Sequence, residues 1–237
     1  MKKLLVMPVL ATVLFTAACR EDGGPTASGP RASVRFFNAT TMTGSGGFTT
    51  NGQFATGSAL AFGQSTPTCA TVDAGSTTFG FGAANTGGTG LSGNALATLN
   101  NQSLTAGGNF TVVATGSATS PTLFLLDDTF AGSLATNQAA VRFVNLAPGA
   151  PNTFNVFTGV LGNGGTLMAT DLTVGAPTAF SAVTSGSNAF TILNGHDIVV
   201  SGSAATLTLQ AGTVNTIAIV PNATSAGYRL VNLPRCA

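Results

Sequence analysis

Hydrophobic and polar residues alternate along many short stretches of this chain. In the first such stretch Val34 and Phe36 flank Arg35, so the aliphatic and aromatic side chains share one face. The same period of two recurs at Phe79 and Phe81, Val141 and Phe143, Phe154 and Val156, Leu207 and Leu209, and Ile217 and Ile219. Successive strand side chains point to opposite faces, so this period indicates half-buried strands. We therefore expect Arg35 and Arg142 to face out.

Turn signals divide these stretches into short strands. Asn194-Gly195 is a strong two-residue hairpin signal. Ala106-Gly107 and Ala211-Gly212 precede the expected strands 110–114 and 216–220. No long helical pattern follows the N-terminal region, and about six to eight strands per 100 residues are typical of a β-sandwich. The sequence predicts an all-β protein built from immunoglobulin- or transthyretin-like β-sandwiches.

The strand pattern occurs twice along the chain. Three blocks recur in the same order at nearly constant spacing: 32–38 with 139–145, 72–79 with 183–190, and 104–107 with 209–212. Such self-similarity indicates a duplicated structural unit. We expect two tandem domains, at residues 32–133 and 138–236, each large enough for a core of its own.

The N-terminus has the layout of an export signal. Lys2 and Lys3 precede an apolar stretch that is too short to span a bilayer comfortably and that closes on Ala17-Ala18. Residues 1–18 are therefore expected to be a signal peptide, and the Gly/Pro/Ser-rich residues 19–31 a flexible tether.

Residues 16–19, Thr-Ala-Ala-Cys, resemble a bacterial lipobox, in which the cysteine is acylated after cleavage. The resemblance implies a lipid anchor on Cys19 and hence membrane attachment. Residue 20 is Arg rather than Asp, which by resemblance to lipoprotein sorting favours the outer membrane, with either face open. The alternative is an ordinary signal peptide cut near Ala18, with Cys19 incidental.

The charge balance restricts the partners. Only 6% of residues are charged, and after Cys19 there is no lysine and only six arginines against seven acids. Nucleic-acid binding requires a basic surface that releases counterions, so we exclude it. If Cys19 is acylated, Cys69 and Cys236 remain, and an oxidising compartment would favour a disulfide between them. Two separate thiols are the alternative.

The start of the second unit reads VRFVNLAPGAP at 141–151, followed by FNVF at 154–157. This resembles the bacterial envelope family called domain of unknown function 4397, whose members open with V-R-x-x-H-x-S-P-D-A-P. The motif positions here are Arg35, Asn38, Arg142, Asn145, Pro148 and Pro151. Asn replaces the common His in both units, and Gly149 replaces the Asp. The resemblance implies an envelope β-domain pair and no established activity.

Residues that could carry chemistry are sparse. His196 is the sole histidine and follows the 194–195 turn. The sequence contains no G-x-S-x-G motif, the turn that presents a nucleophilic serine to a catalytic histidine. Asp127-Asp128 lacks calcium-loop spacing, so we interpret it as a solvated, charged strand end rather than a calcium site. Isolated acids such as Asp73 and Asp171 leave a glycosidase pair open. The glycine-rich stretches 44–47, 82–93 and 162–165 lack the Lys-Ser/Thr ending of phosphate loops and are expected to be hairpin loops.

These observations favour a non-catalytic envelope lipoprotein, with no cofactor and no metal. It would bind an envelope protein or an extracellular polysaccharide, or serve structurally. The alternative is a carbohydrate-active or hydrolase-accessory protein that uses loops near Asp171 and His196.

Overall fold

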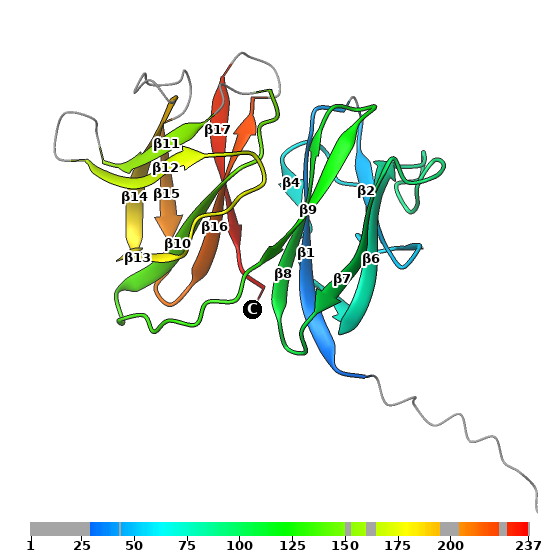
Figure 1. The fold of residues 1–237 in the computed structure, drawn as a ribbon, viewed down its shortest axis with the longest axis horizontal. Coiled ribbons are helices and arrows are strands. Elements are labelled where there is room, and N and C mark those ends of the chain that lie inside the picture. Colours follow the sequence, from blue (N-terminus) through cyan, green and yellow to red (C-terminus); the bar gives the residue numbers. More distant parts are fainter. Residues whose placement is uncertain are drawn as a thin grey trace, which may run out of the picture.

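The structure is a computed structural model that describes residues 29–42, 44–149, 153–159, 165–194, 204–222 and 227–236. Within these ranges the chain is all-β and forms four sheets in two sandwich-like halves (Figure 1). No helix in the described part of the chain is long and apolar enough to cross a membrane. The expected signal peptide, Cys19 and most of the tether lie outside the described residues.

The described residues of the first half form nine strands. They are β1 (Arg31–Thr40), β2 (Gly46–Thr50), β3 (Gln53–Phe54), β4 (Gln64–Ser65), β5 (Ala70–Asp73), β6 (Gly75–Ala83), β7 (Ala97–Leu104), β8 (Asn109–Gly116) and β9 (Pro121–Asp127). One sheet has the order β4-β1-β8-β9, with β5 also paired to β1, and the other has the order β3-β2-β6-β7. The expected strand at 110–114 is confirmed as part of β8.

The second half has the same plan. Its strands are β10 (Gln138–Asn145), β11 (Phe154–Thr158), β12 (Thr166–Leu172), β13 (Ser181–Thr184), β14 (Gly186–Asn194), β15 (Ala205–Leu209), β16 (Val214–Pro221) and β17 (Tyr228–Pro234). The sheets have the orders β13-β10-β16-β17 and β12-β11-β14-β15. In each half the first strand pairs in parallel with the next-to-last strand, β1 with β8 and β10 with β16, while the other pairings are antiparallel.

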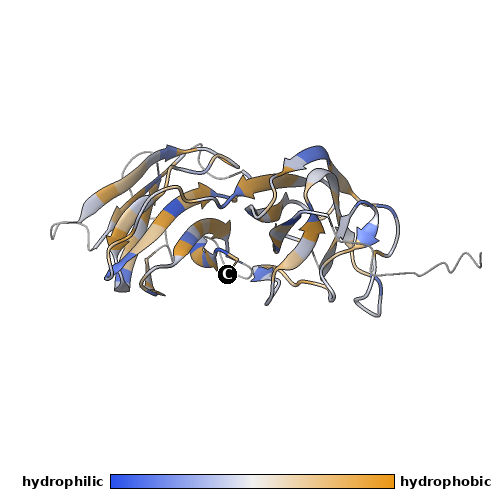
Figure 2. Ribbon diagram, turned by 90° about the horizontal axis from the view of Figure 1, so that it is seen from below, coloured by the Kyte–Doolittle hydropathy of each residue, from blue (hydrophilic) through white to orange (hydrophobic). Residues whose placement is uncertain are grey.

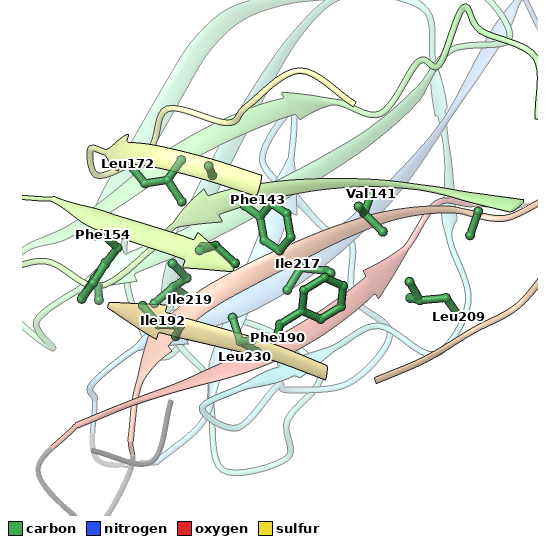
Figure 3. Close-up of a cluster of buried hydrophobic side chains, with 14 residues drawn as sticks. Val141, Phe143, Phe154, Leu172, Phe190, Ile192, Leu209, Ile217, Ile219 and Leu230 are labelled. Carbon is green, nitrogen blue, oxygen red and sulfur yellow. The ribbon is translucent and has the colours of Figure 1, made fainter. Parts of the chain in front are cut away.

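Each half has its own hydrophobic core between its two sheets. In the first half the core is rich in phenylalanine, with Phe36, Phe48, Phe79 and Phe81 fully buried and in ring contact. In the second half Phe143 meets Phe190 at a ring distance of 5.4 Å among isoleucines, leucines and valines (Figure 3). The period-two residues expected to face inward do so, and the alternation predicts this part of the fold correctly.

A third core joins the halves. Phe37, Val113 and Leu126 of the first half are buried with Val144 and Ala218 of the second half in one cluster. The sheet containing β1 and β8 therefore packs face to face on the sheet containing β10 and β16, between the two sandwich cores (Figure 1). Hydrophobic segments accordingly run along the strands of both halves (Figure 2).

Three sequence-based expectations are wrong here. Strands β1, β8, β10 and β16 are buried on both faces, so they are not half-buried as the alternation indicated. The outward faces of these strands meet the other half instead of water, and Arg35 and Arg142 are buried with them. The glycine-rich stretches 44–47 and 82–93 are also not entirely loops, because Gly46 and Gly47 begin β2 and Gly82 and Ala83 end β6.

Candidate functional site: a buried charged cluster between the halves

The two arginines of the repeated V-R-F motif project from β1 and β10 away from their own sandwich cores. Their neighbours along each strand point into those cores, so the alternation of the strand directs Arg35 and Arg142 toward the opposite half. Arg35 is 9% exposed, Arg142 is 4% exposed, and Asp128, directly after β9, is 2% exposed. Three charged side chains are thus enclosed at the junction.

Asp128 and Arg142 form an ion pair across the junction. Arg142 Nη2 donates to Asp128 Oδ1 at 2.6 Å, and Arg142 Nη1 donates to the Asp127 carbonyl oxygen at 2.7 Å. The Arg142 guanidinium also lies 4.6 Å from the centre of the Phe180 ring, which in turn contacts Phe130 edge to face. Charge-assisted hydrogen bonds of this kind are the strong ones in a protein interior.

Equivalent threonines of the two parallel pairs complete the cluster. Thr111 on β8 donates to Asp128 Oδ2 at 2.6 Å, and Thr216 on β16 donates to Asp128 Oδ1 at 3.3 Å. Arg142 Nε donates to the Thr216 hydroxyl at 2.9 Å. Arg35 differs from its counterpart Arg142: its Nη1 donates to the Thr66 carbonyl oxygen at 3.0 Å, and its buried Nε has no hydrogen-bond partner.

Burial dominates the titration of these groups. Burial raises the pKa of the Asp128 carboxyl, while the threonine hydroxyls and Arg142 act to lower it. Burial likewise lowers the pKa of the Arg142 and Arg35 guanidinium groups, and the charge of Asp128 opposes this effect on both. Of the two arginines, Arg142 bonds to Asp128, while the charge of Asp128 acts on both guanidinium groups and the charge of Asp127 adds to the effect on Arg142.

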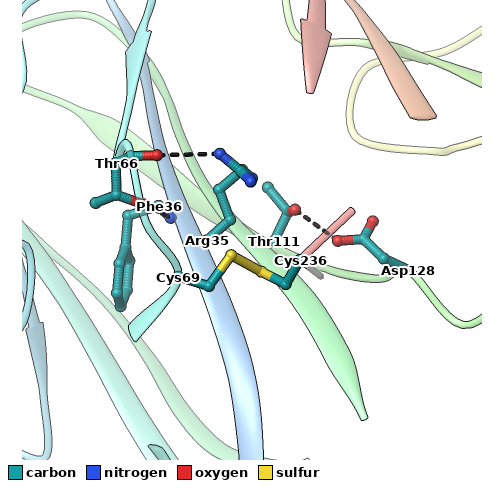
Figure 4. Close-up of a disulfide and its surroundings, with 7 residues drawn as sticks. All are labelled: Arg35, Phe36, Thr66, Cys69, Thr111, Asp128 and Cys236. Atoms are coloured by element: carbon teal, nitrogen blue, oxygen red, sulfur yellow. Dashed lines mark hydrogen bonds between the residues drawn. A yellow bond between two sulfur atoms is a disulfide. The ribbon is translucent and has the colours of Figure 1, made fainter. Parts of the chain in front are cut away.

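A disulfide links the halves beside this cluster. Cys69 and Cys236 are bonded, with their Cα atoms 5.9 Å apart, across a sequence separation of 167 residues (Figure 4). Cys69 directly precedes β5, whose Ala70 pairs with Val34, so it lies across from Arg35 on the neighbouring strand. The disulfide pairing predicted from the cysteine count is confirmed.

The motif asparagines have the same local role in both halves. Asn38 Nδ2 donates to the Leu60 carbonyl oxygen at 2.8 Å, and Asn145 Nδ2 donates to the Leu172 carbonyl oxygen at 3.1 Å. Each Oδ1 accepts a backbone N–H two residues further on. Both side chains are fully buried. They tie the end of the first strand of each half to the loop or strand beside it.

Replacing Asn38 with alanine is expected to lower the free energy of unfolding by about 1–3 kcal/mol, because buried polar groups lose their partners. The Leu60 carbonyl loses its side-chain donor, and the Thr40 N–H and hydroxyl lose their acceptor. Urea unfolding measures the change. Asn100→Ala, at an exposed position of β7, is the matched control. Equal stability of the two variants would contradict this role of Asn38.

The motif residues lie within the part of the chain that matches a known family. The model of the family described as domain of unknown function (DUF4397) matches residues 32–156, just over half of the chain. The chain belongs to the DUF4397 family. No curated protein matches it.

The DUF4397 match runs from β1 to β11 and so crosses from the first half into the second. It contains both V-R-F motifs and Asp128, and so the three charged side chains of the buried cluster, together with the two motif asparagines. The match ends at Val156, so it does not mark a second complete unit, and the duplication stays a prediction. Of the motif prolines, Pro148 is exposed and Pro151 lies outside the described residues.

The other sequence-predicted positions are not gathered by this fold. Asp171 lies exposed near the end of β12 with a φ of 50°, and the Thr153 hydroxyl contacts its carboxylate at 3.4 Å. His196 and Asp197 lie outside the described residues. In the described ranges no three His, Cys, Asp or Glu side chains cluster as metal ligands.

Asp128 is a further residue that the sequence interpretation placed wrongly. Asp127 is exposed, as expected of a strand end, but Asp128 is buried and paired rather than solvated. A strand end gives no sign of a second half packed against it. The doublet itself was the available signal. Successive side chains on a strand point to opposite faces, so two adjacent carboxylates at a strand end cannot both point toward the same side.

Proposed function

We propose that this DUF4397 protein is a non-catalytic cell-envelope lipoprotein whose two halves act as one rigid binding or structural module. The observation that carries the proposal is the location of the family-motif side chains. Arg35, Arg142, Asn38 and Asn145 are all buried, and each bonds strands, loops or halves to one another. Residues committed to such contacts hold the fold together and do not reach a substrate.

The disulfide supports an exported location. Disulfides form and persist in oxidising compartments and are rare in the bacterial cytosol. The Cys69–Cys236 bond is therefore consistent with a signal peptide at residues 1–18, an anchor on Cys19 and delivery to the outer membrane. The low content of charged residues, 6%, suits a module that contacts neutral envelope or matrix components.

The matching strand orders of the halves support a duplicated unit. We propose that residues 32–133 and 138–236 are two immunoglobulin- or transthyretin-like domains with a common ancestor. The parallel pairs β1–β8 and β10–β16 and the equivalent bonds of Asn38 and Asn145 support this origin.

The anchor is tested by acylation of Cys19. In cells fed an alkyne-bearing fatty acid, the full chain is expected to carry the label and to fractionate with membranes. Cys19→Ser is expected to lose the label and to leave the membrane fraction, because residue 19 is the acceptor sulfur. Cys69→Ser is the matched control and is expected to keep the label. An unlabelled wild-type chain would contradict the anchor, and protease treatment of intact and lysed cells then separates surface from periplasmic exposure.

A further inference from the structure

The outward face of sheet β3-β2-β6-β7 contains a hollow with a volume of about 390 Å³. Its lining includes Thr49, Phe54, Leu91, Gly93 and Asn94, and none of the lining residues is charged. The hollow lies on the side of the sheet opposite the phenylalanine core, between the short strand β3 and the loop that joins β6 to β7.

Glycines shape this face. Gly47, Gly80 and Gly82 alternate with the core residues Phe48, Phe79 and Phe81, so they occupy outward positions on β2 and β6. Their φ angles lie outside the left-handed region, and the backbone therefore does not require glycine at these positions.

The three glycines leave space on the outward face of the sheet for neighbouring side chains. A Cβ at Gly47 would overlap the Phe54 ring, one at Gly80 would lie 2.5 Å from the Thr49 hydroxyl, and one at Gly82 would lie 3.4 Å from Leu91. The missing side chains let Phe54 and Leu91 lie directly on the sheet, where they line the hollow.

The second half does not repeat this arrangement. The blocks 72–79 and 183–190 correspond, so the counterparts of Gly80 and Gly82 are Thr191 and Leu193. Both carry side chains, and both are buried. The glycine-lined face is therefore present in the first half and absent from the second. If the glycines served only to form the fold that both halves share, the second half would need them as well.

The chemistry of the hollow fits a sugar ring. Phe54 is half-buried and offers an aromatic surface, whose negative π face attracts the C–H groups of a pyranose. The exposed Asn94 carboxamide and the Thr49 hydroxyl can each donate and accept hydrogen bonds with sugar hydroxyls. A charged ligand would be desolvated there without a counter-charge, which is unfavourable.

We infer that this hollow binds a neutral saccharide unit of an extracellular polysaccharide. The inference rests on the proposed binding role of the envelope module and names its ligand class. Phe54 provides the stacking surface, while Asn94 and Thr49 provide polar contacts.

The test uses the full chain, purified in detergent, on an array of neutral, acidic and basic oligosaccharides. The best neutral ligand is then titrated by calorimetry. Phe54→Ala removes the stacking ring. Gly93→Leu adds bulk at the lining, where a Cβ meets nothing within 4 Å and φ is outside the left-handed region, so the fold should tolerate it. Gly29→Leu, at an equally open glycine outside the hollow, is the matched control.

Binding of at least one neutral oligosaccharide is expected. Phe54→Ala should weaken it by at least about fivefold, as loss of a stacked ring contact implies. Gly93→Leu should also weaken it, because the added side chain occupies space at the lining, and Gly29→Leu should leave it unchanged. Thermal unfolding of each variant verifies the fold. Preference for charged glycans, no binding of neutral ones, or equal affinity of all variants would overturn the inference. A chain that is acylated on Cys19 but binds no neutral glycan would remove this site and leave the proposed anchoring intact.

Discussion

Replacing Asp128 with asparagine is expected to lower the free energy of unfolding by about 3–5 kcal/mol, the usual effect of breaking a buried ion pair. Arg142 would lose its 2.6 Å carboxylate partner and stay buried, and Arg35 would lose the nearest compensating charge. Denaturant unfolding of the full chain measures the change. We also expect the halves to separate at lower denaturant concentration, because the carboxylate bonds residues from both of them.

The neighbouring Asp127→Asn is the matched control. Its side chain is exposed and accepts the Thr129 N–H, which an asparagine oxygen can also accept, and the bond from Arg142 goes to its backbone oxygen, which the substitution keeps. A change below about 0.5 kcal/mol is expected there, as for most surface substitutions. Combining Asp128→Asn with Arg142→Met should recover part of the loss, since the unpaired charge is then removed. Equal stability of the two single variants would show that the buried pair does not stabilise the junction.

Removing the disulfide should produce the second large effect. Cys69→Ser with Cys236→Ser is expected to cost up to about 5 kcal/mol, since a closed loop of 167 residues restricts the unfolded chain strongly. Differential scanning calorimetry should show a lower Tm for the variant under oxidising conditions. With excess reductant the wild-type protein should unfold at nearly the same temperature as the variant.

Each single serine variant should behave as the double variant does, because either substitution opens the same loop. A Tm that does not change on substitution would mean that the core between the halves, and not the covalent link, limits unfolding. A single variant much less stable than the double variant would instead indicate that one unpaired thiol is harmful in the folded protein.

Several parts of the fold are readable in the sequence because they depend on local patterns. Alternation at Val34 and Phe36, or at Ile217 and Ile219, is a direct consequence of strand geometry, and these residues are in the cores as predicted. The pairing of Cys69 with Cys236 followed from counting. The hairpin turn at Asn51-Gly52, with φ angles of 49° and 80°, was missed although it has the same Asn-Gly signal as residues 194–195.

The junction between the halves was not readable in the same way. The alternation at Arg35 and Arg142 is the same whether the outward face meets water or another sheet. Adjacent apolar residues break the alternation at Phe36 and Phe37 and again at Val112 and Val113, and they are a local signal of burial on both faces. The partner of Arg142 depends on how two sheets dock, and no spacing along the chain encodes that contact.

The parallel pairing of β1 with β8 has a mechanical consequence. β1 is the strand that directly follows the N-terminal segment, and its pairing with β8 extends from Ser33 opposite Asn109 to Thr40 opposite Gly116. Tension applied through that segment along β1 loads the evenly spaced hydrogen bonds between β1 and β8 at the same time. A hairpin pulled at its open end would instead lose its hydrogen bonds one after another. If the chain is held at its N-terminus and pulled at the opposite end of the sheet, β1 would therefore bear the load in shear. β1 is hydrogen-bonded to β8 on one side and to β4 and β5 on the other.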